Sequence, residues 1–171
     1  MRQGAIALTV AVMLAIPAMP VKAGPVEDPV IAWNRIMVAT IAGQNPFAQA
    51  RLAAITQLAV FEAVNAITHD HDPYVGVISA PAGASPEAAA VAAAHAVLVN
   101  YVPAAAATLD AARVASLANI GAGPSKDDGL AVGLAAATEL ITLRTGDGSA
   151  PPQFYSPTSS AVGVYVGSEL R

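Results

Sequence analysis

The chain has 171 residues, of which 55% are hydrophobic but only 5% are aromatic, and it contains no cysteine. It has 8 Lys and Arg residues against 12 Asp and Glu residues, which gives a formal net charge of −4. The composition excludes a disulfide framework, and the lack of a basic cluster argues against a nucleic-acid partner. Alanine supplies most of the apolar residues, and alanine-rich segments favour closely packed helices, so we predict an all-α helical bundle.

The amino-terminal segment is typical of an export signal. Arg2 supplies a positive charge, residues 5–19 supply an apolar core, and residues 21–23 (VKA) form a small-x-small cleavage site. The apolar core is short for a membrane span, although an uncleaved anchor stays an alternative. We predict a signal peptide over 1–23, a helical bundle over 24–144 and a periplasmic or secreted location.

Two helices are predicted in the first part of the bundle. Asp28 before Pro29, and Asn45 before Pro46, each combine an N-cap residue with proline at the first helical position. The first helix repeats apolar residues at Val30, Trp33, Met37 and Ile41. The second helix, over 46–67, has two adjacent apolar stripes, one at Leu52, Ile55 and Ala59 and the other at Phe47, Ala50, Ala54, Leu58 and Phe61. We therefore expect other helices to surround it, with the rest of the chain organised around it.

Glu62 and Asn65 are polar neighbours on this otherwise apolar helix, because they are three residues apart. A catalytic carboxylate is one interpretation of the pair. We favour a hydrogen-bonded seam to another helix, because no second acid or histidine lies at helical spacing from Glu62.

A loop is predicted over 68–84, where the sequence HDHD occupies residues 69–72. Two imidazoles in an extended segment could bind a metal, but no further histidine or cysteine is placed to complete the site. We favour a solvated polar loop over a metal site. We expect Tyr74 to anchor this loop by burying its ring.

The next two helices meet at Pro103. Ser85, Pro86 and Glu87 supply a cap, a first helical residue and an acid in the first turn of the third helix. His95 falls on its apolar stripe, which favours a satisfied core residue over a ligand. The fourth helix is predicted over 104–120, and Arg113 on its apolar face must either reach solvent or find a carboxylate.

A break at residues 121–124 precedes the fifth helix, for which residues 125–128 predict a capping box. The segment GAGPSK lacks the order of a phosphate loop, so we interpret it as a turn between helices. Gly129 and Gly133 allow close backbone contact. The predicted apolar stripe contains Leu130, Leu134, Ala137 and Ile141.

Residues 145–171 are rich in Gly, Pro and Ser and have no helical period, so we predict an extended arm. The arm ends abruptly at Arg171. We expect that the organisation of the protein continues beyond this residue.

Several segments in this order resemble a known family. They are WNRIMVAT, FEAVNAI, DPYVG, AAHAVLVNYVP, the run from Leu109 that ends in LRTGDGS, and GVYV. Together they resemble the amino-terminal half of bacterial vanadium-dependent haloperoxidases, which are relatives of the type 2 phosphatidic-acid phosphatases. The resemblance spans residues 28–166 and implies an all-α bundle belonging to an exported enzyme that holds vanadate, or phosphate in the phosphatases.

Complete members of this family hold the oxyanion with a Lys, two Arg, a P-S-G-H segment and a final Arg…His. The cations neutralise its charge, and a histidine acts as ligand or nucleophile. This sequence has no P-S-G-H, and its only lysine outside the signal, Lys126, lies in a helical cap. We therefore assign no catalytic, cofactor-binding or metal residue.

The resemblance leads us to expect the scaffold half of a haloperoxidase-like peroxidase that is inactive alone. Vanadate is implied only for the complete enzyme. The expected partner is a missing carboxyl-terminal half, or a second copy bound through apolar helix faces. An acid phosphatase of the same superfamily and a non-catalytic protein-binding module stay as alternatives.

Overall fold

The computed structural model describes residues 27–149, 159 and 161–163, and this part of the chain is all-α with no strand. The elements are α1 (Pro29–Ile41), α2 (Pro46–Thr68), α3 (Pro86–Tyr101), the 3₁₀ turn η1 (Pro103–Ala105), α4 (Ala106–Ala118) and α5 (Pro124–Leu143). The predicted five-helix fold is thus confirmed. The predicted signal peptide and most of the predicted arm lie outside the described residues.

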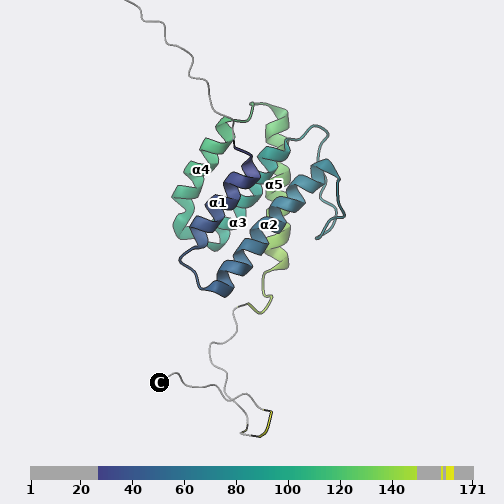
Figure 1. Ribbon diagram of the computed structural model, residues 1–171. Coiled ribbons are helices and arrows are strands. Elements are labelled where there is room, and N and C mark those ends of the chain that lie inside the picture. The colour runs from purple at the N-terminus through teal and green to yellow at the C-terminus, as the bar shows by residue number, and fades with distance from the viewer. Residues whose placement is uncertain (1–26, 150–158, 160, 164–171) are drawn as a thin grey trace, which may run out of the picture.

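The central helix is α3, against which α1, α2, α4 and α5 all pack (Figure 1). Every residue from 88 to 94 is buried, and all of them are alanine except Val91. Small side chains around the whole circumference let four neighbours approach α3 at once. The described helices are thus organised around α3 and not, as expected, around α2, of which the described residues cover only one side.

On α2, the buried side chains include Leu52, Ile55 and Ala59, which form the first predicted stripe. The second predicted stripe, Phe47, Ala50, Ala54, Leu58 and Phe61, is exposed or half-buried, and we call it the α2 stripe. Phe47 is 89% exposed. The length and mean hydropathy of 1.3 of α2 would suit a membrane span, but they also suit a helix whose inner side packs against α3 and α5.

The most extensive helix contact joins α5 to α3, and two glycines of α5 lie in it. A Cβ atom added to Gly133 would lie 2.2 Å from the carbonyl oxygen of Ala89, and one added to Gly129 would lie 2.4 Å from that of Ser85. The predicted role of these glycines is confirmed. The predicted α5 stripe is correct only in part, since Ala137 is buried and Leu130 and Ile141 pack half-buried against the core, but Leu134 is 58% exposed. The buried residues of α5 are Gly129, Val132, Gly133, Ala136, Ala137 and Leu140.

Capping residues and prolines in the local sequence determine where most of the helices begin. The side chains of Asp28, Asn45 and Ser85 each accept a hydrogen bond from a backbone N–H in the first turn, as predicted. The capping box predicted for α5 is wrong, because the helix begins at Pro124 after Gly123, with no capping side chain. Proline suits the first helical position, because an N–H there would have no acceptor within the helix and its absence costs nothing.

Candidate functional site

The candidate site is a polar network that joins α2, the loop after it and the end of α5. It begins at Glu62, which is only 2% exposed and whose Oε1 accepts a hydrogen bond of 2.6 Å from the N–H of Tyr74. The seam predicted for Glu62 and Asn65 thus exists, but it holds the loop and not another helix.

Asn65 makes two hydrogen bonds to one loop residue. Its Nδ2 donates to the carbonyl of His71 at 2.8 Å, and its Oδ1 accepts from the N–H of His71 at 2.9 Å. The chain reaches this position because His69 has φ 57°, a left-handed conformation that ends α2 while its N–H still donates to the Asn65 carbonyl. The loop is therefore attached directly after the helix ends.

The HDHD segment lies on the outside of this attachment. His69, Asp70, His71 and Asp72 are all exposed, and the His71 ring stacks on Phe61 with the centroids 6.0 Å apart. Among the described residues, no three His, Cys, Asp or Glu side chains are grouped so that they could hold a metal ion. A cavity of about 140 Å³ lies beneath the loop, lined by Glu62, Asn65, His69, His71, Val77 and Ile78 among others.

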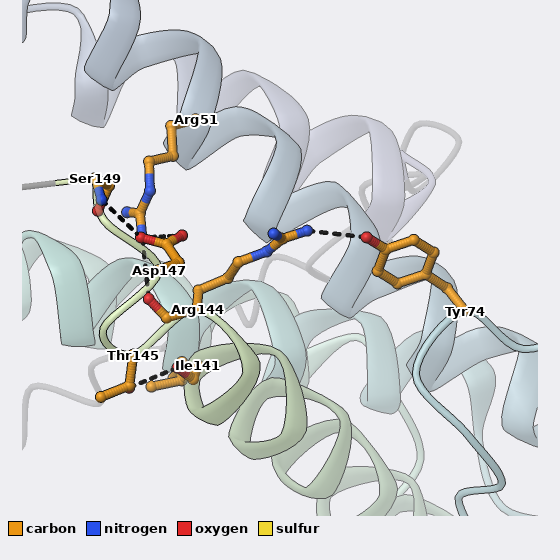
Figure 2. Close-up of polar contacts among 7 residues, drawn as sticks. All are labelled: Arg51, Tyr74, Ile141, Arg144, Thr145, Asp147 and Ser149. Atoms are coloured by element: carbon orange, nitrogen blue, oxygen red, sulfur yellow. Dashed lines mark hydrogen bonds and ion pairs between the residues drawn. The ribbon is translucent and has the colours of Figure 1, made fainter.

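The second part of the network is an ion pair between α2 and the segment after α5 (Figure 2). Nη2 of Arg51 lies 3.0 Å from Oδ2 of Asp147 and donates to the carbonyl of Arg144 at 3.3 Å. The guanidinium also lies over the Tyr101 ring, 5.4 Å from its centroid. The described start of the predicted arm is thus held against α2.

Asp147 is the one described residue whose pKa clearly departs from its ordinary value. Hydrogen bonds from Ser149 and from the guanidinium of Arg51 lower the pKa of Asp147 from 3.8 to about 2. Both partners favour the ionised carboxylate. Asp147 is therefore a permanent anion at neutral pH, suited to hold Arg51 and not to transfer protons.

The third part of the network returns to the loop. Nη2 of Arg144 donates to the Tyr74 hydroxyl at 2.9 Å, as Figure 2 shows. Tyr74 is 53% exposed, so the expectation that it anchors the loop by burying its ring is wrong. It anchors the loop through its polar atoms, with Glu62 bound to its N–H and Arg144 to its hydroxyl. We call the network of Arg51, Glu62, Asn65, Tyr74, Arg144 and Asp147 the loop clamp.

His95 lies outside the loop clamp. Its Nε2 is 2.7 Å from Oδ1 of Asp110, and its ring meets Trp33 edge-on with the centroids 6.1 Å apart. The interpretation of His95 as a satisfied structural histidine agrees with this packing, although the residue is half-buried. Arg113, also half-buried, lines the same shallow surface beside α5.

Lys126 has a structural task of its own. Its Nζ donates to the carbonyl of Leu117 at 2.6 Å and to that of Ile120 at 3.4 Å, so it caps the end of α4. The sequence places Lys126 in a cap, but it belongs to the preceding helix. The neighbouring turn links α4 to α5, as predicted for GAGPSK.

The residues of the loop clamp attach the loop and the segment after α5 to the helices. Arg51 and Asp147 neutralise each other, Glu62 binds a backbone N–H, and Arg144 donates to the Tyr74 hydroxyl. These contacts hold a long loop to two helices. Sequence reasoning missed Arg51, Tyr101, Arg144 and Asp147 as a group. The sequence offered only the LRTGDGS segment as a signal for this group of residues. Arg51 and Asp147 are 96 residues apart, so no local spacing relates them.

No family model, no curated protein and no solved structure matches this chain. The fold and the loop clamp define it as an all-α helical domain with a surface loop held by the buried Glu62 and by Arg144, and with the segment after α5 held by Arg51.

Proposed function

We propose that this chain is the amino-terminal scaffold of an exported vanadium-dependent haloperoxidase-like protein. In this proposal the complete protein oxidises halide with peroxide at a vanadate site, and residues outside this chain supply that site. The observation that carries the proposal is the loop clamp. It joins Glu62 of FEAVNAI, Tyr74 of DPYVG and Arg144 of LRTGDGS, three of the segments on which the resemblance rests.

The described residues do not fit vanadate. An oxyanion needs several converging cations with unused donors, together with a histidine. Arg35 pairs with Glu27, Arg51 pairs with Asp147, and Lys126 donates to backbone carbonyls. The two other described cations do not converge, because Arg144 donates to the Tyr74 hydroxyl after α5 while Arg113 lies on α4 beside Leu130 and Leu134. We therefore derive no catalytic step from this part of the chain.

The first experiment is an activity assay on the purified chain with orthovanadate, hydrogen peroxide and bromide or chloride. The expected result is no halide oxidation and no hydrolysis of p-nitrophenyl phosphate. Clear turnover of either kind by the chain alone would overturn the proposal, since the oxyanion site would then have to lie within it.

The second experiment reads the coding DNA beyond the codon for Arg171. Lysine, arginine, P-S-G-H and Arg…His segments in frame support the haloperoxidase-like proposal. The acid phosphatase shares these groups, so the two activities are separated by assaying the longer product for halide oxidation and for phosphate release.

A helical module that binds another protein is the second candidate, and the exposed apolar side chains favour it. Val114 on α4 is 68% exposed, and Leu134 on α5 is 58% exposed. Such side chains suit a partner surface. A stop codon directly after Arg171 would favour this module over the haloperoxidase-like scaffold.

A further inference from the structure

Glu62 has an unusual environment for an acid. Only 2% of it is exposed, and its Oε1 accepts one hydrogen bond, from the N–H of Tyr74. Within the described part of the chain, its second carboxylate oxygen has no hydrogen-bond partner, and no cationic side chain forms an ion pair with it. Buried carboxylates usually have a cation or several donors, because removing their charge from water is costly. Glu62 can therefore accept a further donor.

The cavity of about 140 Å³ beneath the loop, which we call the loop cavity, gives access to this second oxygen. Among the described residues, no buried side-chain oxygen is both shielded from solvent and without a hydrogen-bond partner. The second oxygen of Glu62 is therefore reachable, and the loop cavity is the space that Glu62 lines. Its other walls include the apolar side chains of Ala66, Pro73 and Ile78. The loop cavity thus combines one carboxylate with mainly apolar walls.

The charges around the loop cavity favour a cation. Residues 62–78 contain three acids, Glu62, Asp70 and Asp72, and no lysine or arginine. His69 and His71 also line the cavity, and a neutral imidazole offers one nitrogen as a hydrogen-bond acceptor. A ligand that brings both a positive charge and N–H donors is therefore complementary to this site.

The loop clamp holds the walls of the loop cavity in place. Asn65 binds both backbone groups of His71, and the N–H of His69 donates to the Asn65 carbonyl. The carboxylate of Glu62 is fixed by the N–H of Tyr74. A ligand that enters a site whose groups are already positioned loses less binding free energy to ordering.

We propose that the loop cavity binds a small primary ammonium ion, which donates to the free oxygen of Glu62 and lays a short alkyl chain against Ala66 and Ile78. The inference goes beyond the proposed function and does not depend on it. The size agrees, because an engineered cavity of about 150 Å³ holds benzene. A metal ion suits the site less well, since the described residues group no three metal-binding side chains there.

A titration followed by NMR of the backbone amides tests the proposal. The Tyr74 amide is the reporter, because it donates to the same carboxylate. The probe is propylammonium chloride, added at constant ionic strength in a phosphate buffer that contains no other amine. We expect saturable shifts of the loop and of the end of α2, with a dissociation constant on the order of 1 mM, which is attainable for so small a ligand.

Two comparison ligands separate charge from hydrogen bonding in the wild-type chain. 1-Propanol has the same alkyl chain without the charge, and tetramethylammonium has the charge without an N–H donor. We expect each of them to bind at least about tenfold more weakly than propylammonium, because a charge-assisted hydrogen bond to Glu62 requires both properties.

Glu62→Gln tests the acid itself. The amide oxygen of glutamine still accepts from the N–H of Tyr74, so the loop stays attached while the charge is lost. Glu139→Gln on the exposed surface of α5 removes the same charge elsewhere and is the matched control. Propylammonium should bind at least about tenfold more weakly to Glu62→Gln and with unchanged affinity to Glu139→Gln.

Three results would overturn the proposal. They are a folded wild-type chain without saturable shifts up to about 50 mM propylammonium, well above the expected dissociation constant, equal binding of propylammonium and either comparison ligand, and undiminished binding to a folded Glu62→Gln variant. Circular dichroism shows whether each variant is folded. If Glu62→Gln does not fold, the three ligands compared in the wild-type chain decide the question alone.

Discussion

Replacing Gly133 by alanine should destabilise the protein although alanine is the better helix former. In a free helix the change would stabilise by about 1 kcal/mol. Here the new Cβ would lie 2.2 Å from the Ala89 carbonyl oxygen and 2.8 Å from the Ala92 Cβ. Ordinary contacts begin at 3.4 Å, so α5 would have to move away from α3 by roughly 1 Å along its most extensive contact.

The expected net effect follows from these opposing terms. Overpacking of a core typically costs 1–3 kcal/mol, and the obstacle here is backbone, which cannot rotate away. After the gain of about 1 kcal/mol in helix propensity is subtracted, we expect a loss of about 0–2 kcal/mol in the free energy of unfolding, towards the upper end of this range because the obstacle is backbone. Urea unfolding followed by circular dichroism at 222 nm measures this quantity.

Gly121→Ala is the matched control for this prediction. A Cβ at Gly121 has no atom within 4 Å, and its backbone is not left-handed. The control should lie within about 0.5 kcal/mol of the wild type or be slightly more stable. If Gly133→Ala is as stable as the control, the close approach of α3 and α5 is refuted.

Three further changes probe the loop clamp and the exposed surface. Glu62→Ala leaves the Tyr74 N–H without its acceptor and should cost about 1–3 kcal/mol in urea unfolding, while Glu139→Ala on exposed α5 surface should cost less than about 0.5 kcal/mol. Because the pKa of folded Asp147 lies below 3.8, its ionised form stabilises the fold above that pH, and this contribution is lost as the pH falls from 3.8 towards about 2. Asp147→Asn should accordingly lower the urea midpoint at pH 7, and the difference from the wild type should become much smaller at pH 2. The exposed apolar side chains should make the folded wild type bind the dye ANS, and Phe47→Ser should weaken that fluorescence without loss of helix signal.

The helix starts were predictable because their causes are local. Asn45 and Pro46 together specify a cap and a first turn, and no distant contact is needed. The buried face of an alanine-rich helix is different, because several of its stripes are almost equally apolar. On α5 the buried side is the one that carries Gly133, where the backbone of α3 comes close. Leu134, although larger and more apolar, was left exposed.

The loop clamp shows the same limit for polar residues. Glu62 and Asn65 were recognisable as unusual because they are polar residues on an apolar helix, but their partners lie in a loop with no helical period. The pairing of Arg51 with Asp147 depends on where α5 ends relative to α2. No local pattern carries that information, since it results from the packing of both helices against α3.

A structural role and a catalytic role of the loop clamp predict different results in the proposed haloperoxidase-like protein. If Glu62, Tyr74 and Arg144 only attach the loop, replacing them should change the free energy of unfolding and the hydrogen-exchange protection of the loop. The pH dependence of any halide oxidation by a longer product should then stay unchanged. If one of them instead takes part in the reaction, the pH profile of the longer product should change even in variants whose unfolding is unaltered. The geometry favours the first result, because Glu62 is buried and bonded to the Tyr74 N–H, and Arg144 is bonded to the hydroxyl of the same residue.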